Sequence, residues 1–227
     1  MLLTGNRKMI SLLLKIVVIL SAIIGTTLSY IAGRRSFMGG SRVFMFFTTQ
    51  SNIAIAVISA VGLVLMLGRK SISNILYVIK YVGTVAITLT GVVFVAVLAP
   101  ALGVNAWNIQ NVLTHVVVPL AAVADFFVAS IGAEIKKINV LYVLIPPILY
   151  AIYAGIGYIK GWQFVEGYNY PYFFLNWGSP ADAFGFTKEL PFMGCAWWIL
   201  LLFIFLLVVG FCYLKVLDRL DKRFNKK

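Results

Sequence analysis

Long runs without a charged side chain constrain this chain more than any other feature. The segments 43–67 and 81–124 contain no Asp, Glu, Lys or Arg. Such runs match or exceed the roughly 20 apolar residues that cross the hydrocarbon core of a bilayer. A soluble domain of 227 residues, with 62% hydrophobic and only 11% charged residues, would lack the polar groups to cover its apolar surface. The sequence therefore excludes a water-soluble fold.

Six apolar segments are long enough to cross a membrane, which predicts one all-α, polytopic membrane domain over residues 1–227. The predicted spans are about 10–32, 43–67, 81–99, 108–131, 138–159 and 190–214. Pro100 separates the third span from the fourth, and Pro146 with Pro147 should kink the fifth. Pro191 is expected in the first turn of the sixth span. Lys15 is expected to extend its ammonium group to the membrane surface.

The basic residues predict how the chain is oriented. Five of the 19 Lys and Arg residues fall on one side: Arg34, Arg35, Arg42, Lys160 and Lys188. The remaining fourteen share the other side with both termini, which are therefore predicted to be cytoplasmic. The net charge of +12 is scattered through loops, so nucleic acid is not an expected partner. The first apolar segment lacks a cleavage site and is interpreted as a retained helix.

The predicted outer loop, residues 160–190, is rich in Trp, Tyr and Phe. Aromatic rings at this density are typical of a segment that lies among lipid headgroups. The same loop also fits a lid over a substrate site. The sequence alone favours the aromatic belt among the headgroups over the lid.

His115 is the only histidine, and it falls within the fourth predicted span with Asn111 on the same helical face. Ionisable groups inside a membrane are costly and mark functional sites by default. Pro119 removes the helix hydrogen bond to the His115 carbonyl, so the backbone should be distorted there. The alternative is a histidine that only hydrogen-bonds a neighbouring helix.

Thr48, Ser51 and Asn52 lie at i, i+3 and i+4, on one face of the second predicted span. Thr48 would lie about 8 Å inside its span and His115 about 10 Å inside the fourth, both from the same membrane surface. A hydroxyl beside an imidazole can attack a carbonyl, with the imidazole as base. Asn52 or Asn111 could then donate to the oxyanion, and Ser51 could support the site. Polar contacts between membrane helices produce the same pattern.

Asp125 lies about 15 Å further along the fourth span than His115 and cannot orient that imidazole. It is expected to pair with Lys80, Lys136 or Lys137. The sequence contains no metal-ligand or cofactor motif, so neither a metal nor a cofactor is expected.

Three motifs together resemble a known family. They are Phe46–Asn52, as an F-T-x-x-S-N signature; Asn111–Pro119 followed by Asp125; and Tyr170–Leu175, as a Y-P-Y-P-F-L loop. The pattern is similar to bacterial relatives of the androgen-induced and androgen-dependent integral-membrane proteins. The eukaryotic members are threonine hydrolases that cleave fatty-acid esters of hydroxy fatty acids with one threonine and one histidine.

The resemblance implies that Thr48 is the nucleophile and His115 the base, with Thr49 as a competing nucleophile. It also implies a location in a bacterial cell membrane and a lipid-like ester as substrate. A non-enzymatic carrier or binding protein for a small hydrophobic ligand is the alternative, because the same polar cavity would serve either function.

Overall fold

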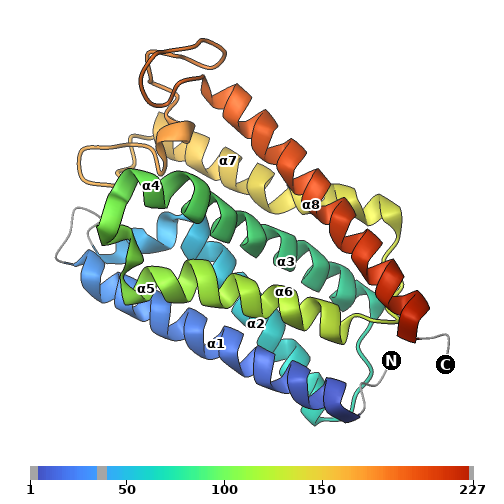
Figure 1. Ribbon diagram of the computed structural model, residues 1–227. Helices are drawn as coiled ribbons and strands as arrows, with labels where there is room; N and C mark the ends of the chain where they lie inside the picture. The colour runs from blue at the N-terminus through green and yellow to red at the C-terminus, as the bar shows by residue number, and fades with distance from the viewer. Residues whose placement is uncertain (1–4, 35–39, 225–227) are drawn as a thin grey trace.

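The structure, a computed structural model, describes residues 5–34 and 40–224 as helices joined by loops (Figure 1). Arg35, one of the basic residues assigned to the predicted outer side, lies outside these ranges. Six helical segments of the described chain are long and apolar enough to cross a membrane: Gly5–Gly33, Phe47–Leu67, Asn74–Trp107, Ile109–Ala129, Lys137–Ile159 and Cys195–Phe224. The predicted all-α, six-span fold is confirmed, and the chain is an integral membrane protein.

Several spans combine more than one type of helix. The first is α1 (Gly5–Gly33), and the second is α2 (Phe47–Leu67), which follows the 3-10 turn η1 (Gly40–Met45). The third comprises α3 (Asn74–Val93), η2 (Phe94–Leu98), α4 (Ala99–Leu102) and η3 (Gly103–Trp107). The fourth comprises α5 (Ile109–Val112), η4 (Leu113–Val117) and α6 (Val118–Ala129). The fifth comprises η5 (Lys137–Leu144) and α7 (Ile145–Ile159); the loop turn η6 (Phe173–Leu175) and then α8 (Cys195–Phe224) follow.

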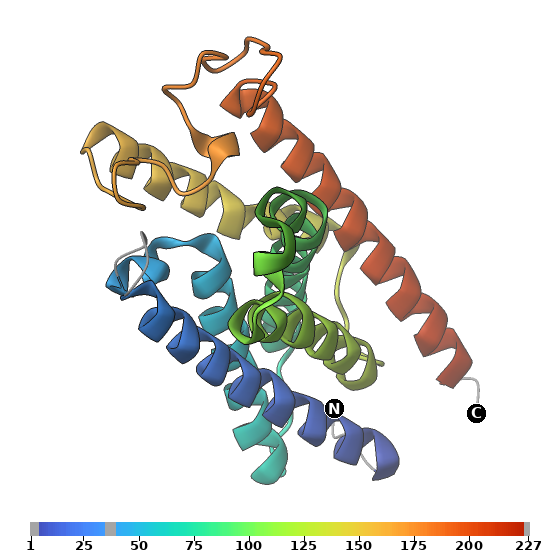
Figure 2. The ribbon, with the colours of Figure 1, turned by 60° about the vertical axis from the view of Figure 1, so that its left-hand side comes forward.

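The first four spans form one packed group. Within it, α1 and α3 each contact α2 and α6. The last two spans join through contacts of η5 and α8 with α3, and Figures 1 and 2 show α7 and α8 on the side of α3 away from α1. The start of α1 and the end of α8 lie at the same end of the bundle (Figure 1). That this end is cytoplasmic stays a prediction from the basic residues.

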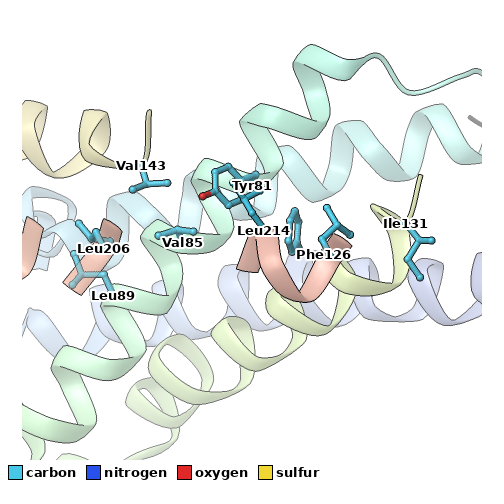
Figure 3. Close-up of a cluster of buried hydrophobic side chains, with 9 residues drawn as sticks. Tyr81, Val85, Leu89, Phe126, Ile131, Val143, Leu206 and Leu214 are labelled. Carbon is cyan, nitrogen blue, oxygen red and sulfur yellow. The ribbon is translucent and has the colours of Figure 1, made fainter. Parts of the chain in front are cut away.

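Figure 3 shows the buried apolar cluster that attaches α8 to the earlier spans. Its side chains come from α3, α8, η5, α6 and the turn after α6: Tyr81, Val85, Leu89, Phe126, Ile131, Val143, Leu206, Leu214 and Leu217. The cluster fixes α8 against α3 and thereby places the loop before α8 above the start of α2.

Two spans contain a π turn directly before a proline. The π turns η2 and η4 each end two residues before a proline, Pro100 and Pro119 respectively. A proline has no N–H to bond the carbonyl four residues back and clashes with that carbonyl, and the wider turn accommodates both effects. The turn η4 contains His115, so the distortion predicted at this residue is present.

The other prolines differ in outcome. Pro146 and Pro147 lie in the first turn of α7, directly after the segment changes from 3-10 to α-helix, and the kink predicted there stays a prediction. The prediction that Pro191 opens the sixth helix is wrong, because α8 begins at Cys195. The residues before it form backbone hydrogen bonds across the loop instead, including Gly194 N–H to the Gly185 carbonyl at 2.9 Å.

Helices α1, α3 and α8 extend beyond their predicted ends, and α1 begins at Gly5 rather than near residue 10. The helix α3 begins at Asn74 rather than near residue 81, with the Ser73 hydroxyl accepting a hydrogen bond from the Leu76 amide as N-cap. The helix α8 continues to Phe224, ten residues past its predicted end. These extensions run through charged residues, at which the predicted spans end because a charged side chain is costly within a bilayer.

Lys15 does not extend to the surface as predicted but is buried, with 2% of its area exposed. Its ammonium group donates to both carboxylate oxygens of Asp125, at 2.8 and 2.7 Å, and to the Ser11 hydroxyl at 2.8 Å. Lys80 donates to the same carboxylate at 2.6 Å, and Ser11 donates to it at 2.5 Å. We call Ser11, Lys15, Lys80 and Asp125 the ionic cluster. Of the three partners predicted for Asp125, the described contacts include Lys80 and neither Lys136 nor Lys137.

Candidate functional site

The loop between α7 and α8 is attached to the start of α2 by buried side chains. These are Phe46, Tyr150, Ala154, Phe164, Phe174 and Leu175. Within this cluster the ring of Tyr172 stacks on Phe174, with centroids 5.0 Å apart and planes at 4°. Burial raises the pKa of the Tyr172 phenol, which therefore stays protonated. The packing directs the Tyr172 hydroxyl to the first turn of α2.

Thr48 is the second residue of α2 and meets Tyr172. The Thr48 hydroxyl lies 3.3 Å from the Tyr172 hydroxyl, and the Thr48 amide donates to the same oxygen at 3.4 Å. The segment before Phe47 is the 3-10 turn η1 rather than part of the helix. Thr48 is therefore nearer the end of its helix than predicted, among the first-turn amides that lack intrahelical acceptors.

Thr48 opens into a small chamber of about 60 Å³ between α2, α3, α7, α8 and the loop. Hydroxyl-bearing residues in its wall are Thr48, Thr90, Tyr150 and Tyr172, and the remaining lining is apolar. Thr49, the competing nucleophile, is not among the lining residues. The chamber therefore offers one threonine at the helix end to an apolar ligand.

Asn52 connects the Thr48 turn to the fourth span. Its side-chain amide donates to the Thr48 carbonyl at 2.8 Å and to the Thr114 carbonyl, next to His115, at 3.1 Å. Asn52 is fully buried, and both its amide protons are used in these bonds. In this conformation Asn52 holds two spans together and offers no proton to an oxyanion.

We expect Asn52→Ala to lower the free energy of unfolding by about 1–3 kcal/mol, because two buried carbonyls lose a donor. Thermal unfolding of the purified protein in detergent measures the effect. The control is Gln50→Ala, which removes an exposed amide that donates to the Phe44 carbonyl of the preceding turn η1 and should cost about 0.5 kcal/mol or less. Equal losses in the two variants would contradict the role given to Asn52.

His115 is buried in the π turn η4, with 9% of its area exposed. Its Nδ1 atom lies 3.0 Å from the Thr114 hydroxyl and 3.1 Å from the Asn111 carbonyl. The Thr114 hydroxyl donates its own proton to the Gln110 carbonyl at 2.8 Å. Both neighbours of Nδ1 are therefore acceptors, so Nδ1 carries the proton and Nε2 carries the lone pair. The ring stacks on Phe94 at 4.0 Å.

The remaining predicted residues support the backbone around the site. Ser51 lies 2.7 Å from the Thr90 hydroxyl, and its hydroxyl is 3.0 Å from the Thr48 carbonyl. The Asn111 side chain donates to the Ala106 carbonyl at 2.9 Å, which fixes the start of the fourth span. Within residues 5–34 and 40–224, no group of three His, Cys, Asp or Glu side chains is placed to hold a metal ion.

The structure brings the turns of Thr48 and His115 together without joining their side chains. Among the described residues, the hydroxyl of Thr48 has Tyr172 as its hydrogen-bond partner, and His115 is not among the residues that line the chamber. The Asn52 side chain links the two turns by hydrogen bonds to the Thr48 and Thr114 carbonyls. Reaction between them requires the Thr48 hydroxyl to exchange Tyr172 for the imidazole.

Sequence reasoning missed Tyr172, Tyr150 and Thr90 as parts of this site. Tyr172 lies in the loop motif that carried the family resemblance, so that motif was the available signal. No periodicity marks Thr90, which faces the site because α3 packs against α2.

The chain was compared with protein-family models, with curated proteins and with solved structures, and none of them matches.

Proposed function

We propose that this protein is an intramembrane hydrolase of lipid-like carboxylic esters, with Thr48 as nucleophile and His115 as base. One observation carries the proposal. Thr48 lines a largely apolar chamber, and the buried Asn52 amide connects its turn to that of His115. The free lone pair on Nε2 is the form of imidazole that a general base requires.

The proposed reaction has two steps. In the first, His115 Nε2 accepts the Thr48 proton as the hydroxyl oxygen attacks the ester carbonyl, and the alcohol leaves with that proton. In the second, water releases the acid from the acyl-threonine. Two donors lie nearest the attacked carbonyl: the Tyr172 hydroxyl and the first-turn amide of Thr48. That amide now donates to the Tyr172 oxygen, and in the reaction the oxyanion would take the place of this oxygen as acceptor.

The substrate class follows from the surroundings of Thr48. Both the bilayer and the lining of the chamber favour a ligand with hydrocarbon chains. The family resemblance adds a fatty-acid ester of a hydroxy fatty acid as the proposed substrate, and a bacterial cell membrane as the proposed location.

The test is covalent labelling of the purified protein with a fluorophosphonate probe for serine and threonine hydrolases. We expect Thr48→Ala and His115→Ala each to reduce labelling by about 100-fold or more, since each removes a group that the first step needs. The matched control is Thr49→Ala, which removes the adjacent hydroxyl outside the chamber and should label normally. Undiminished labelling of a folded Thr48→Ala variant would refute the assignment.

One observation favours the second candidate function, a non-enzymatic carrier or binding protein for a hydrophobic ligand. The Thr48 hydroxyl is bonded to Tyr172 rather than to His115, as in a wall that only shapes a cavity. This function predicts that ligand retention is unchanged in Thr48→Ala and that mass spectrometry detects no acyl-protein. An acyl group found on Thr48 would exclude it.

A further inference from the structure

A second, larger space lies next to the Thr48 chamber. This groove has a volume of about 580 Å³ between α2, α3 and the fifth span. Its walls include Ala54 and Ile58 of α2, Val82 of α3, and Ile145 and Leu149 of α7. By contrast, the Thr48 chamber measures about 60 Å³ and is too small for a whole lipid.

The groove faces the hydrocarbon of the bilayer. Ile145 and Leu149 on its α7 wall are 49% and 60% exposed, and Ile79 on its α3 wall is 46% exposed. All three lie in helices that can span a membrane, where apolar surface of this kind contacts acyl chains. Such a surface favours a hydrocarbon chain over water or a soluble ligand.

The polar end of the groove adjoins the chamber. Gln50 and Ser51 line the groove near the start of α2. The Ser51 hydroxyl lies 2.7 Å from the hydroxyl of Thr90, which lines the chamber. From Gln50 the groove follows α2 to Ile58, a distance of about 12 Å at the helical rise. A chain lying there would have its polar end beside Thr48 and its tail towards the opposite end of the bundle.

Two aromatic rings form the wall between the spaces. Phe47 and Tyr150 line both the groove and the chamber, and their ring centroids are 5.3 Å apart with the planes at 66°. We propose that the groove binds one acyl chain of a membrane-resident ester, and that the Phe47–Tyr150 pair separates this chain from the carbonyl held at Thr48. The inference rests on the proposed hydrolase for the role of Thr48, whereas binding of the chain is tested independently of the reaction.

The test uses a palmitoyl ester with a photoreactive diazirine midway along its chain, in phosphatidylcholine vesicles that contain the purified protein. We expect crosslinks on the groove walls, at residues such as Val82 and Leu149. Ala54→Trp fills the groove from an exposed position on α2 and should lower crosslinking about tenfold. Leu149→Trp fills it from the α7 wall and provides a second variant should the first fail to fold.

The matched control is Val64→Trp, which adds the same ring at a 68% exposed position of α2 that lines neither space. Crosslinking should persist in this variant, and also in Thr48→Ala, because binding precedes chemistry. Crosslinks spread over all lipid-facing helices, or undiminished in both groove variants, would overturn the inference.

Rates of ester hydrolysis distinguish a failure of this inference from a failure of the proposed function. If the wild type cleaves palmitoyl and acetyl esters of one alcohol, Ala54→Trp should slow only the palmitoyl ester, and equal slowing of both would refute the groove. If the wild type cleaves neither ester, the hydrolase proposal fails, and crosslinking alone decides whether the groove binds an acyl chain.

Discussion

Replacing Asp125 by alanine is expected to lower the free energy of unfolding by about 3–5 kcal/mol, because it leaves buried ammonium groups without a counter-charge. Lys15 loses two of its three hydrogen bonds, and Lys80 loses its ion pair. Both lysine side chains are largely shielded, with 2% and 12% of their areas exposed, so little solvation would replace the lost carboxylate. Unfolding in mixed detergent micelles measures the loss.

An exposed ion pair provides the control for this prediction. Asp218 pairs with Lys222 at 2.9 Å on α8, with both side chains largely exposed, so Asp218→Ala should cost about 1 kcal/mol or less. The triple change Lys15→Met, Lys80→Met and Asp125→Leu removes every charge of the ionic cluster and should recover most of the lost stability. A single Asp125→Ala variant as stable as the wild type would show that the cluster does not hold the bundle together.

Gly91→Ala is expected to destabilise the protein by about 1–3 kcal/mol, although alanine is normally more stable than glycine within a helix. A Cβ atom at Gly91 would lie 2.9 Å from the His115 carbonyl oxygen and 3.2 Å from the Pro119 ring. The carbonyl belongs to the π turn and cannot rotate away as a flexible side chain would. The variant should therefore also displace His115, which chemical shifts of its labelled imidazole would reveal.

Gly155→Ala in α7 makes the same change where space is available. The nearest atom to its new Cβ would be Trp177 Cζ2 at 3.9 Å, an ordinary contact. This variant should gain about 0.5–1 kcal/mol from the helix preference of alanine. If Gly91→Ala lowers and Gly155→Ala raises the free energy of unfolding, α3 needs a residue without a side chain where it approaches η4. Changes of the same sign in both variants would contradict this.

The sequence predicts the number of spans and their approximate positions because apolar length is a local property. It fails where a distant residue changes the meaning of a local signal. Lys80 predicts the boundary of a span, yet it lies inside α3, where its ammonium group pairs with the carboxylate of Asp125 in the fourth span. Pro191 predicts the start of a helix, yet the backbone around it forms hydrogen bonds within the loop instead of helical ones.

The candidate site shows the same division. Thr48, Asn52 and His115 are recognisable because polar residues are rare within apolar segments. The order in which they connect depends on packing between spans, so the sequence could not reveal that Asn52 bridges two backbones or that Tyr172 caps the Thr48 turn. The loop 160–194 between the last two spans carries no periodicity from which the position of one hydroxyl could be derived.

The ionic cluster has a consequence for biosynthesis. Lys15 emerges from the ribosome 110 residues before Asp125, and Lys80 emerges 45 residues before it. Lys15 is therefore made long before its anion, and a lysine near a helix centre costs about 2.5–3.5 kcal/mol in the bilayer. In a nascent chain arrested before Asp125, a cysteine introduced by Ser11→Cys should react with a water-borne maleimide, and in the finished chain it should be protected. Synthesis of the fourth helix would then complete the insertion of the first.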